Sequence, residues 1–167
     1  MTEITGQCLC GALRYAMAAP AQRVTLCSCH FCQRATGTER MTLPVFNLSD
    51  LTVRAGTPAT YTHVSEGSGK QIHIHHCPAC ATKLWMTFER WPGLVGLYGG
   101  TLDDPDQVTL APESTKQIFL SSARRGTVVL PGIPAYWNHA ATLDGTPERA
   151  YVVDVPTLVE DMMIGED

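Results

Sequence analysis

Short stretches in which hydrophobic and polar residues alternate make up most of the chain, a pattern typical of β-strands. They are rich in β-branched and aromatic residues and are separated by Gly, Pro, Asn or Asp. The strictest alternation, Ile72-His73-Ile74-His75, predicts that the isoleucines face the core and the histidines face solvent. The predicted strands are Gly11–Ala16, Arg23–Cys27, Met41–Phe46, Leu51–Ala55, Lys70–His75, Lys83–Phe88 and Leu94–Tyr98.

Two segments have helical features. His30–Thr38 is expected to form a short helix that ends at Gly37, and amide groups of its first turn would stabilise nearby thiolates. Pro156–Met163 has apolar residues at helical spacing after a starting proline, which predicts a short C-terminal helix. No repeat or low-complexity linker interrupts the pattern, so residues 1–167 are expected to form a single, mainly β domain.

The composition is that of a folded globular domain, with 44% hydrophobic and 17% charged residues. Twelve Lys and Arg against sixteen Asp and Glu give a net charge of −4, which speaks against nucleic acid as a partner. The apolar runs are too short to cross a membrane, and the first residues lack the pattern of a signal peptide. We therefore expect a cytoplasmic protein with no membrane partner.

Seven cysteines, all before residue 81, are the main chemical feature of the chain. An odd number cannot all pair within one chain, and clustered thiols in a reducing compartment are more often metal ligands than disulfides. They fall into three groups, namely Cys8-Leu9-Cys10, Cys27-Ser28-Cys29-His30-Phe31-Cys32 and Cys77-Pro78-Ala79-Cys80.

The spacing within these groups suits two zinc ions per chain. A C-x-x-C turn lets two sulfurs converge, and the two sulfurs of C-x-C on a strand face the same side. Seven thiols can fill one closed site of four, which is the structural type, and one site of three with an open position, the catalytic type. The grouping favoured by contiguity is Cys8, Cys10, Cys77 and Cys80 in the first site, and Cys27, Cys29 and Cys32 in the second.

The same residues allow other interpretations. His30 or His76 could complete a second closed site, which would make both metals structural. A redox role for Cys77 and Cys80 would need a helix after the motif, whereas the following residues predict a strand. The acidic pair Asp103-Asp104, followed by proline, is typical of a solvated turn rather than of a catalytic pair.

Four motifs follow one another along the chain: Gly6-Gln7-Cys8-Leu9-Cys10-Gly11, Cys27-Ser28-Cys29-His30-Phe31-Cys32-Gln33-Arg34, Cys77-Pro78-Ala79-Cys80 and Gly99-Gly100-Thr101-Leu102-Asp103-Asp104-Pro105. In this order they resemble the glutathione-dependent formaldehyde-activating enzyme (GFA) family, which includes centromere protein V. The resemblance covers roughly residues 4 to 120.

This resemblance implies an Mss4-like fold of small packed β-sheets with two zinc sites. It implies structural zinc at the four-cysteine group and catalytic zinc at the three-cysteine group, the same grouping that contiguity favours. The implied activity is that of a carbon–sulfur lyase, in which glutathione adds to formaldehyde to give S-(hydroxymethyl)glutathione. Ser28 stands where the family usually has His. Ala81 stands where the family usually has Gly, so the turn after Cys80 is expected to differ slightly.

We therefore expect an enzyme whose partners are a small thiol, glutathione or a similar one, and formaldehyde or another small aldehyde. The product would be a hemithioacetal, and the reverse reaction would be the lyase direction. The alternative is a non-catalytic, zinc-stabilised binding module of the same fold. Methionine sulfoxide reductases share the fold but need a redox cysteine apart from the metal, and the two proposed sites use all seven cysteines here.

Overall fold

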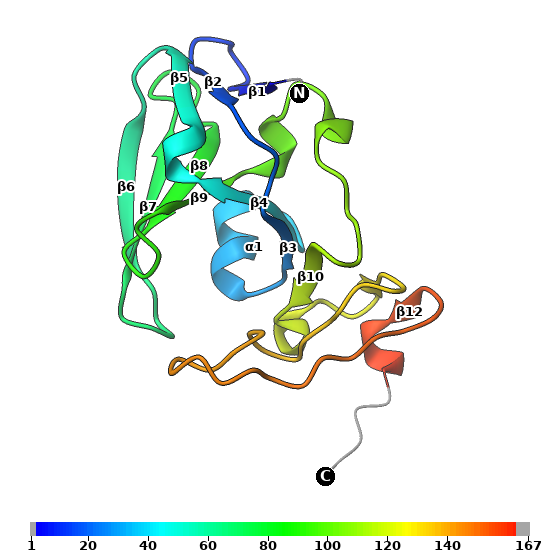
Figure 1. The fold of residues 1–167 in the computed structure, drawn as a ribbon. Coiled ribbons are helices and arrows are strands. Elements are labelled where there is room, and N and C mark those ends of the chain that lie inside the picture. The colour runs from blue at the N-terminus through cyan, green and yellow to red at the C-terminus, as the bar shows by residue number, and fades with distance from the viewer. Residues whose placement is uncertain (1–2, 163–167) are drawn as a thin grey trace. The chain divides into compact units, whose positions relative to one another are not determined.

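The computed structural model describes residues 3–162, which form mostly short β-strands (Figure 1). The chain divides into two compact units, each made of two separate stretches. The first unit comprises Met1–Val24 and Thr42–Thr109, and the second comprises Thr25–Met41 and Leu110–Asp167. The expectation of a single domain stays a prediction.

Two antiparallel sheets make up the first unit. One has the order β1-β2-β5, with β1 (Ile4–Gln7), β2 (Arg14–Met17) and β5 (Leu51–Ala55). The other runs β4-β9-β8-β7-β6, with β4 (Met41–Asn47), β9 (Leu94–Leu97), β8 (Lys83–Phe88), β7 (Gln71–His76) and β6 (Ala59–Val64). Single 3₁₀ turns lie at Leu48–Asp50, Gly99–Thr101 and Pro105–Gln107.

The second unit contains the α-helix of the described residues, α1 (His30–Thr36), and several short strands. Strand β3 (Arg23–Cys27) begins in the first unit and ends in the second, where β10 (Thr115–Ile118) lies beside it. The remaining elements are β11 (Val128–Val129), which pairs with β12 (Thr157–Leu158), and the 3₁₀ turns η4 (Leu120–Ser122) and η5 (Val159–Asp161).

Each unit has its own hydrophobic core. In the second unit the core is small, formed by Leu120, Val129, Ala135 and Val159. The larger core of the first unit is formed by Ile4, Cys8, Leu13, Tyr15, Met17, Phe46, Cys77, Leu84, Trp85, Val95 and Leu97. Two of the predicted metal ligands are thus core residues, so the packing that excludes water also holds their sulfurs in place.

The predicted strands correspond to β2, β3, β4, β5, β7, β8 and β9, whereas β1, β6, β10, β11 and β12 were not predicted. Three of the predicted strands, β3, β5 and β8, have the predicted bounds. The helix predicted after the middle cysteine motif is α1, and Gly37 caps it with φ of 72°, a backbone conformation that favours glycine. The turn at Asp103 and Asp104 is exposed, as predicted, and the Asp104 carboxylate accepts a hydrogen bond from the amide of Asp106 at 2.9 Å.

The predicted C-terminal helix at Pro156–Met163 is wrong for the residues that the structure describes; Met163 lies outside them. Thr157 and Leu158 are strand β12, paired with Val129 and Val128 of β11, and the single turn η5 follows. The amide of Val159 donates to the carbonyl of Thr127 at 2.9 Å. Pairing with a distant strand therefore replaces the local hydrogen bonds of a helix.

The histidines of β7 also differ from the prediction. Ile74 is buried as expected, but His73 and His75 are half-buried rather than fully exposed. The ring of His75 stacks on Trp85, with 5.4 Å between centroids and 20° between planes. Burial, followed by the charges of the neighbouring histidines, lowers the pKa of His75. Ile72 is half-buried as well, and His75 lies opposite the buried Trp85 of β8, so the alternation does not separate a core face from a solvent face in this strand.

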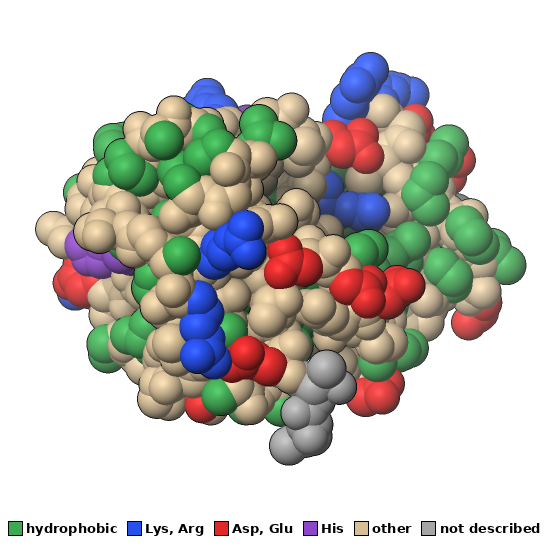
Figure 2. Space-filling model, turned by 90° about the horizontal axis from the view of Figure 1, so that it is seen from above, with side chains coloured by type: hydrophobic (Ala, Val, Ile, Leu, Met, Phe, Trp, Pro, Cys, Tyr) green, Lys and Arg blue, Asp and Glu red, His purple; other side chains and the backbone are tan. Residues whose placement is uncertain are grey.

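Charged side chains of both signs are interspersed on the face of the molecule drawn in Figure 2. Blue and red side chains lie next to one another there, in keeping with the small net charge of −4. None of the helices within residues 3–162 has the length and apolar character needed to cross a membrane.

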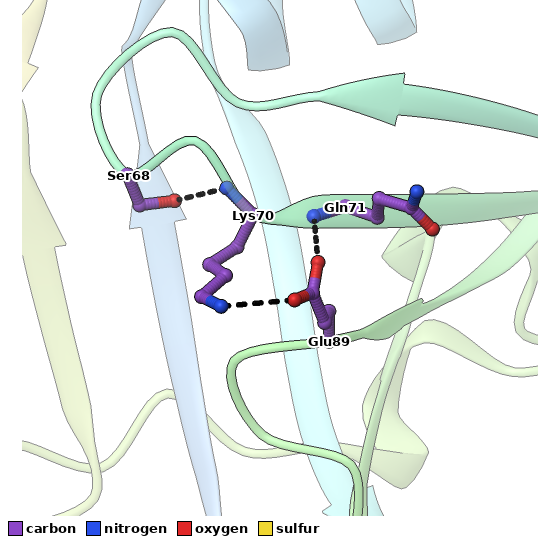
Figure 3. Close-up of polar contacts among 4 residues, drawn as sticks. All are labelled: Ser68, Lys70, Gln71 and Glu89. Atoms are coloured by element: carbon purple, nitrogen blue, oxygen red, sulfur yellow. Dashed lines mark hydrogen bonds and ion pairs between the residues drawn. The ribbon is translucent and has the colours of Figure 1, made fainter.

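Glu89, which follows β8, contacts the β6–β7 hairpin where its connecting loop enters β7 (Figure 3). Its two carboxylate oxygens accept from the amide of Gln71 at 2.8 Å and from Nζ of Lys70 at 2.9 Å. The amide of Lys70 also donates to Oγ of Ser68 at 3.4 Å. The Gln71 amide first, and then the Lys70 side chain, lower the pKa of Glu89 below its usual value of 4.5.

Because this pKa is lowered in the folded state, the ionised Glu89 stabilises the fold above about pH 4.5, and the effect is lost as the pH falls further. We expect Glu89→Gln to lower the melting temperature slightly at neutral pH and to have no effect in acid, where the wild-type carboxylate is protonated. Thermal unfolding followed by circular dichroism between about pH 7 and pH 3 measures this. Glu66→Gln, at an exposed position in the β6–β7 loop, is the control. A pH-independent difference for Glu89→Gln would contradict the prediction.

Candidate metal centres

Two hairpin turns of the first unit bring four cysteines together. Cys8 and Cys10 lie in the turn between β1 and β2, and Cys77 and Cys80 lie in the turn between β7 and β8. Their sulfurs all lie within 4.8 Å of one another. The Sγ atoms of Cys8 and Cys10 are 3.5 Å apart, and those of Cys10 and Cys77 are 3.8 Å apart.

These sulfur positions suit a zinc ion. Four thiolates bound tetrahedrally at about 2.3 Å from zinc have sulfurs about 3.8 Å apart, close to the distances found here. The amide of Leu13 donates to the sulfur of Cys8 at 3.2 Å, and the Thr82 hydroxyl contacts the sulfur of Cys80 at 3.2 Å. Hydrogen bonds from the side chain and then the amide of Thr82 lower the pKa of Cys80 to about 5. Such donors favour the thiolate form that metals bind.

The turn that carries Cys77 and Cys80 contains a strained residue. Ala81 has φ of 59°, in the left-handed region that a side chain with a Cβ atom resists. The turn is closed by hydrogen bonds from the amide of Ala81 to the carbonyl of Cys77 and from the amide of Cys77 to the carbonyl of Thr82, each 2.9 Å long. These bonds hold the backbone in the conformation that glycine would adopt without strain, so Ala81 conforms to the turn at an energetic cost.

We therefore expect Ala81→Gly to stabilise the protein. Relief of the left-handed strain, about 1–2 kcal/mol, exceeds the added entropy of glycine in the unfolded chain, leaving a net gain of about 0.5–1 kcal/mol in the free energy of unfolding. Urea unfolding of the zinc-loaded protein measures this. Ala79→Gly, in the same turn but with ordinary φ, is the matched control and should be destabilising. Equal losses for both variants would show that Ala81 is not strained.

The second cluster lies in the second unit and is built from one continuous stretch. Cys27 ends β3, Cys29 caps the N-terminus of α1, and Cys32 lies in the first turn of that helix. Their three sulfurs lie within 4.8 Å of one another. Cys27 and Cys32 are buried, whereas Cys29 is partly exposed. The cluster therefore has one accessible side, at Cys29.

The three thiols of this cluster are not equivalent. The thiols of Cys27 and Cys32, and then the amides of Cys32 and Phe31, donate to Cys29 and lower its pKa to about 3. The amide of Cys32 is 3.4 Å from this sulfur, as expected for a thiol at a helix start. Donation to Cys29 raises the pKa of Cys27 to about 12. These contacts favour the thiolate at Cys29 over thiolates at the other two cysteines, whose protons a bound cation would displace.

The structure brings together the cysteines that the spacing grouped. All seven are free thiols, four in one cluster and three in the other, so the chain can bind two metal ions. Neither cluster includes His30, which is exposed, or His76. Sequence reasoning missed the donors to the sulfurs, Leu13 and Thr82. Thr82 could have been noticed as a hydroxyl two residues after Cys80, but an amide donor such as that of Leu13 leaves no trace in the sequence.

The model of the GFA family, described as glutathione-dependent formaldehyde-activating enzyme, matches residues 3–122. The chain belongs to this family, whose fold is Mss4-like, and this confirms the predicted fold class. Both cysteine clusters lie within the matched region.

Individual proteins that are similar to this chain include the following two. A Halomonas elongata protein named "Putative glutathione-dependent formaldehyde-activating enzyme" is 28% identical over 119 residues, which cover 66% of this chain and 76% of that protein. A crystal structure of a Rhodobacter sphaeroides protein superposes with a TM-score of 0.47 at 21% identity, covering 59% of this chain and 87% of that one.

Proposed function

We propose that this protein is a zinc-dependent enzyme of the carbon–sulfur lyase type. It adds a small thiol, glutathione or a similar one, to formaldehyde or another small aldehyde, forming a hemithioacetal such as S-(hydroxymethyl)glutathione, and catalyses the reverse reaction. We further propose a cytoplasmic location, because the seven free thiols need a reducing compartment to stay available for metal.

The observation that carries this proposal is the difference between the two clusters. Four sulfurs in the first unit satisfy every position of a tetrahedral ion, which is the structural arrangement. Three sulfurs in the second unit would leave one position of a tetrahedral ion without a protein sulfur, and one of the three, Cys29, is partly exposed. An open position is what a substrate needs. We therefore assign structural zinc to Cys8, Cys10, Cys77 and Cys80, and catalytic zinc to Cys27, Cys29 and Cys32.

In this proposal the chain's own residues prepare the second site. The thiols of Cys27, Cys29 and Cys32 supply three soft ligands, and burial of two of them keeps water from the back of the site. A zinc ion bound there would hold the substrate thiol in its thiolate form, the nucleophile that attacks an aldehyde carbon. Three thiolates around a zinc ion would give a net charge of −1, which would favour a sulfur nucleophile over activation of water.

The choice of thiol and aldehyde is supported by the family and by the name of the Halomonas elongata protein. At 28% identity that name supports a reaction class more than a particular substrate pair. The alternative, a zinc-stabilised binding module without turnover, uses the same two clusters, so only experiments on metal content and catalysis separate the two.

Metal analysis tests the two-site arrangement. We expect two zinc ions per chain in the purified protein and one in Cys29→Ser, because loss of one of three ligands leaves the second cluster too weak to retain zinc. Circular dichroism of Cys29→Ser should remain that of the folded protein. Cys10→Ser is the matched control and should lose the other ion. One zinc ion per chain in the wild type would rule out the proposed arrangement.

Exchange spectroscopy tests the reaction. With ¹³C-labelled formaldehyde and glutathione, NMR measures how fast the adduct forms and breaks down. We expect the wild-type protein to accelerate this exchange above the spontaneous rate, and Cys29→Ser to lose the acceleration while keeping its fold. Absence of acceleration by a protein that holds two zinc ions would favour the binding module over this reaction.

A further inference from the structure

The side chain of Gln33, in α1, ties together two backbone segments of the second unit. Its Nε2 atom donates to the carbonyl of Ser28 at 2.6 Å and to the carbonyl of Ser122 at 2.8 Å. Carbonyl oxygens only accept hydrogen bonds, so the amide NH₂ must face them, and it uses both of its hydrogens. We call this arrangement, in which one side-chain amide donates to two backbone carbonyls, a double clamp.

The first clamped segment carries the three-cysteine cluster. Ser28 lies between Cys27 and Cys29 and is 1% exposed. Its amide donates to the carbonyl of Ile118 at 3.1 Å, so both polar groups of this residue's backbone are held. The amide of Gln33 itself donates to the carbonyl of Cys29 at 3.0 Å. The spacing of the first two sulfurs is thereby set by contacts that do not require a metal.

The second clamped segment is the turn η4, which ends at Ser122. Its entry residue, Phe119, has φ of 60°, a strained conformation, and its amide donates to the carbonyl of Asn138 at 2.8 Å. The amide of Ser121 donates to the carbonyl of Trp137 at 2.9 Å. Both acceptors lie beyond the 3–122 region matched by the family model. Residues beyond 122 therefore hold the turn η4 in place. Gln33 in turn links this turn to the cysteine loop.

We propose that Gln33 is a positioning residue of the three-cysteine site, which sets how tightly and in what geometry that site holds its metal. The inference rests on the proposed function only in taking Cys27, Cys29 and Cys32 as metal ligands. Groups outside the ligand set that orient it commonly change metal affinity by about tenfold or more. Gln33 acts on the ligands through the Ser28 carbonyl rather than by touching substrate.

Gln117 offers a contrast within the same unit. Its Nε2 atom also donates to two carbonyls, those of Leu130 at 3.2 Å and Ile133 at 3.3 Å, and it is 1% exposed. Neither acceptor belongs to the cysteine loop. Gln117→Leu therefore loosens the second unit by removing a comparable double clamp, and it separates a general loss of stability from a loss of ligand positioning.

The test compares zinc release from the wild type, Gln33→Leu, Gln33→Glu and Gln117→Leu during competition with a coloured chelator. Cys29→Ser identifies the phase that belongs to the three-cysteine site. For Gln33→Leu we expect the zinc dissociation constant of that site to rise about tenfold, with the four-cysteine site unchanged. Gln33→Glu should have at least as large an effect, because its carboxylate would face two carbonyl oxygens.

Cobalt substitution supplies a second measurement. We expect the thiolate-to-cobalt absorption of the three-cysteine site to change in Gln33→Leu and to stay the same in Gln117→Leu. Unchanged zinc affinity and an unchanged spectrum in Gln33→Leu, or equal changes in Gln117→Leu, would overturn the positioning role. So would the absence of a second zinc in the wild type. A wild type that binds two zinc ions without accelerating adduct exchange, while Gln33→Leu weakens one site, would refute only the proposed reaction.

Discussion

Convergence of sulfur atoms is the constraint on which the first unit depends. Two hairpin turns, far apart in the sequence, must place four thiols within 4.8 Å of one another. Two of these thiols, Cys8 and Cys77, are also members of the hydrophobic core. A metal ion bound there would act on the same atoms as the packing, so its binding free energy would add directly to the stability of the fold. Strain at Ala81 is tolerated because several hydrogen bonds and the core together determine that turn.

The second cluster is held by a different kind of structure. Its sulfurs come from six consecutive positions, at the end of a strand and the start of a helix, so local geometry alone brings them close. What local geometry does not supply is rigidity. That comes from distant backbone, through the Ile118 and Ser122 carbonyls, which hold the loop by way of the Ser28 amide and the Gln33 side chain. In this site the local sequence brings the three sulfurs together, and contacts with residues distant in the sequence hold them in position.

The same distinction explains how much could be predicted from the sequence. Strands such as Leu51–Ala55 and the helix at the middle cysteine motif follow from periodicity and capping, which are local. The contiguity of the middle motif favoured the grouping of the cysteines without fixing it, and the family resemblance agreed with it. Strand β12 was missed because its structure is decided by pairing with β11, and a local pattern of apolar residues suggested a helix instead. The contacts of Gln33 were beyond reach for the same reason, since a sequence motif does not show which carbonyl lies opposite a side chain.

Both clusters combine buried sulfurs with at least one that solvent can reach. Cys8 and Cys77 are buried while Cys10 is exposed, and Cys27 and Cys32 are buried while Cys29 is partly exposed. An ion that reaches either cluster from solvent would therefore meet an accessible sulfur first, that of Cys10 or the partly exposed Cys80 in one cluster and that of Cys29 in the other.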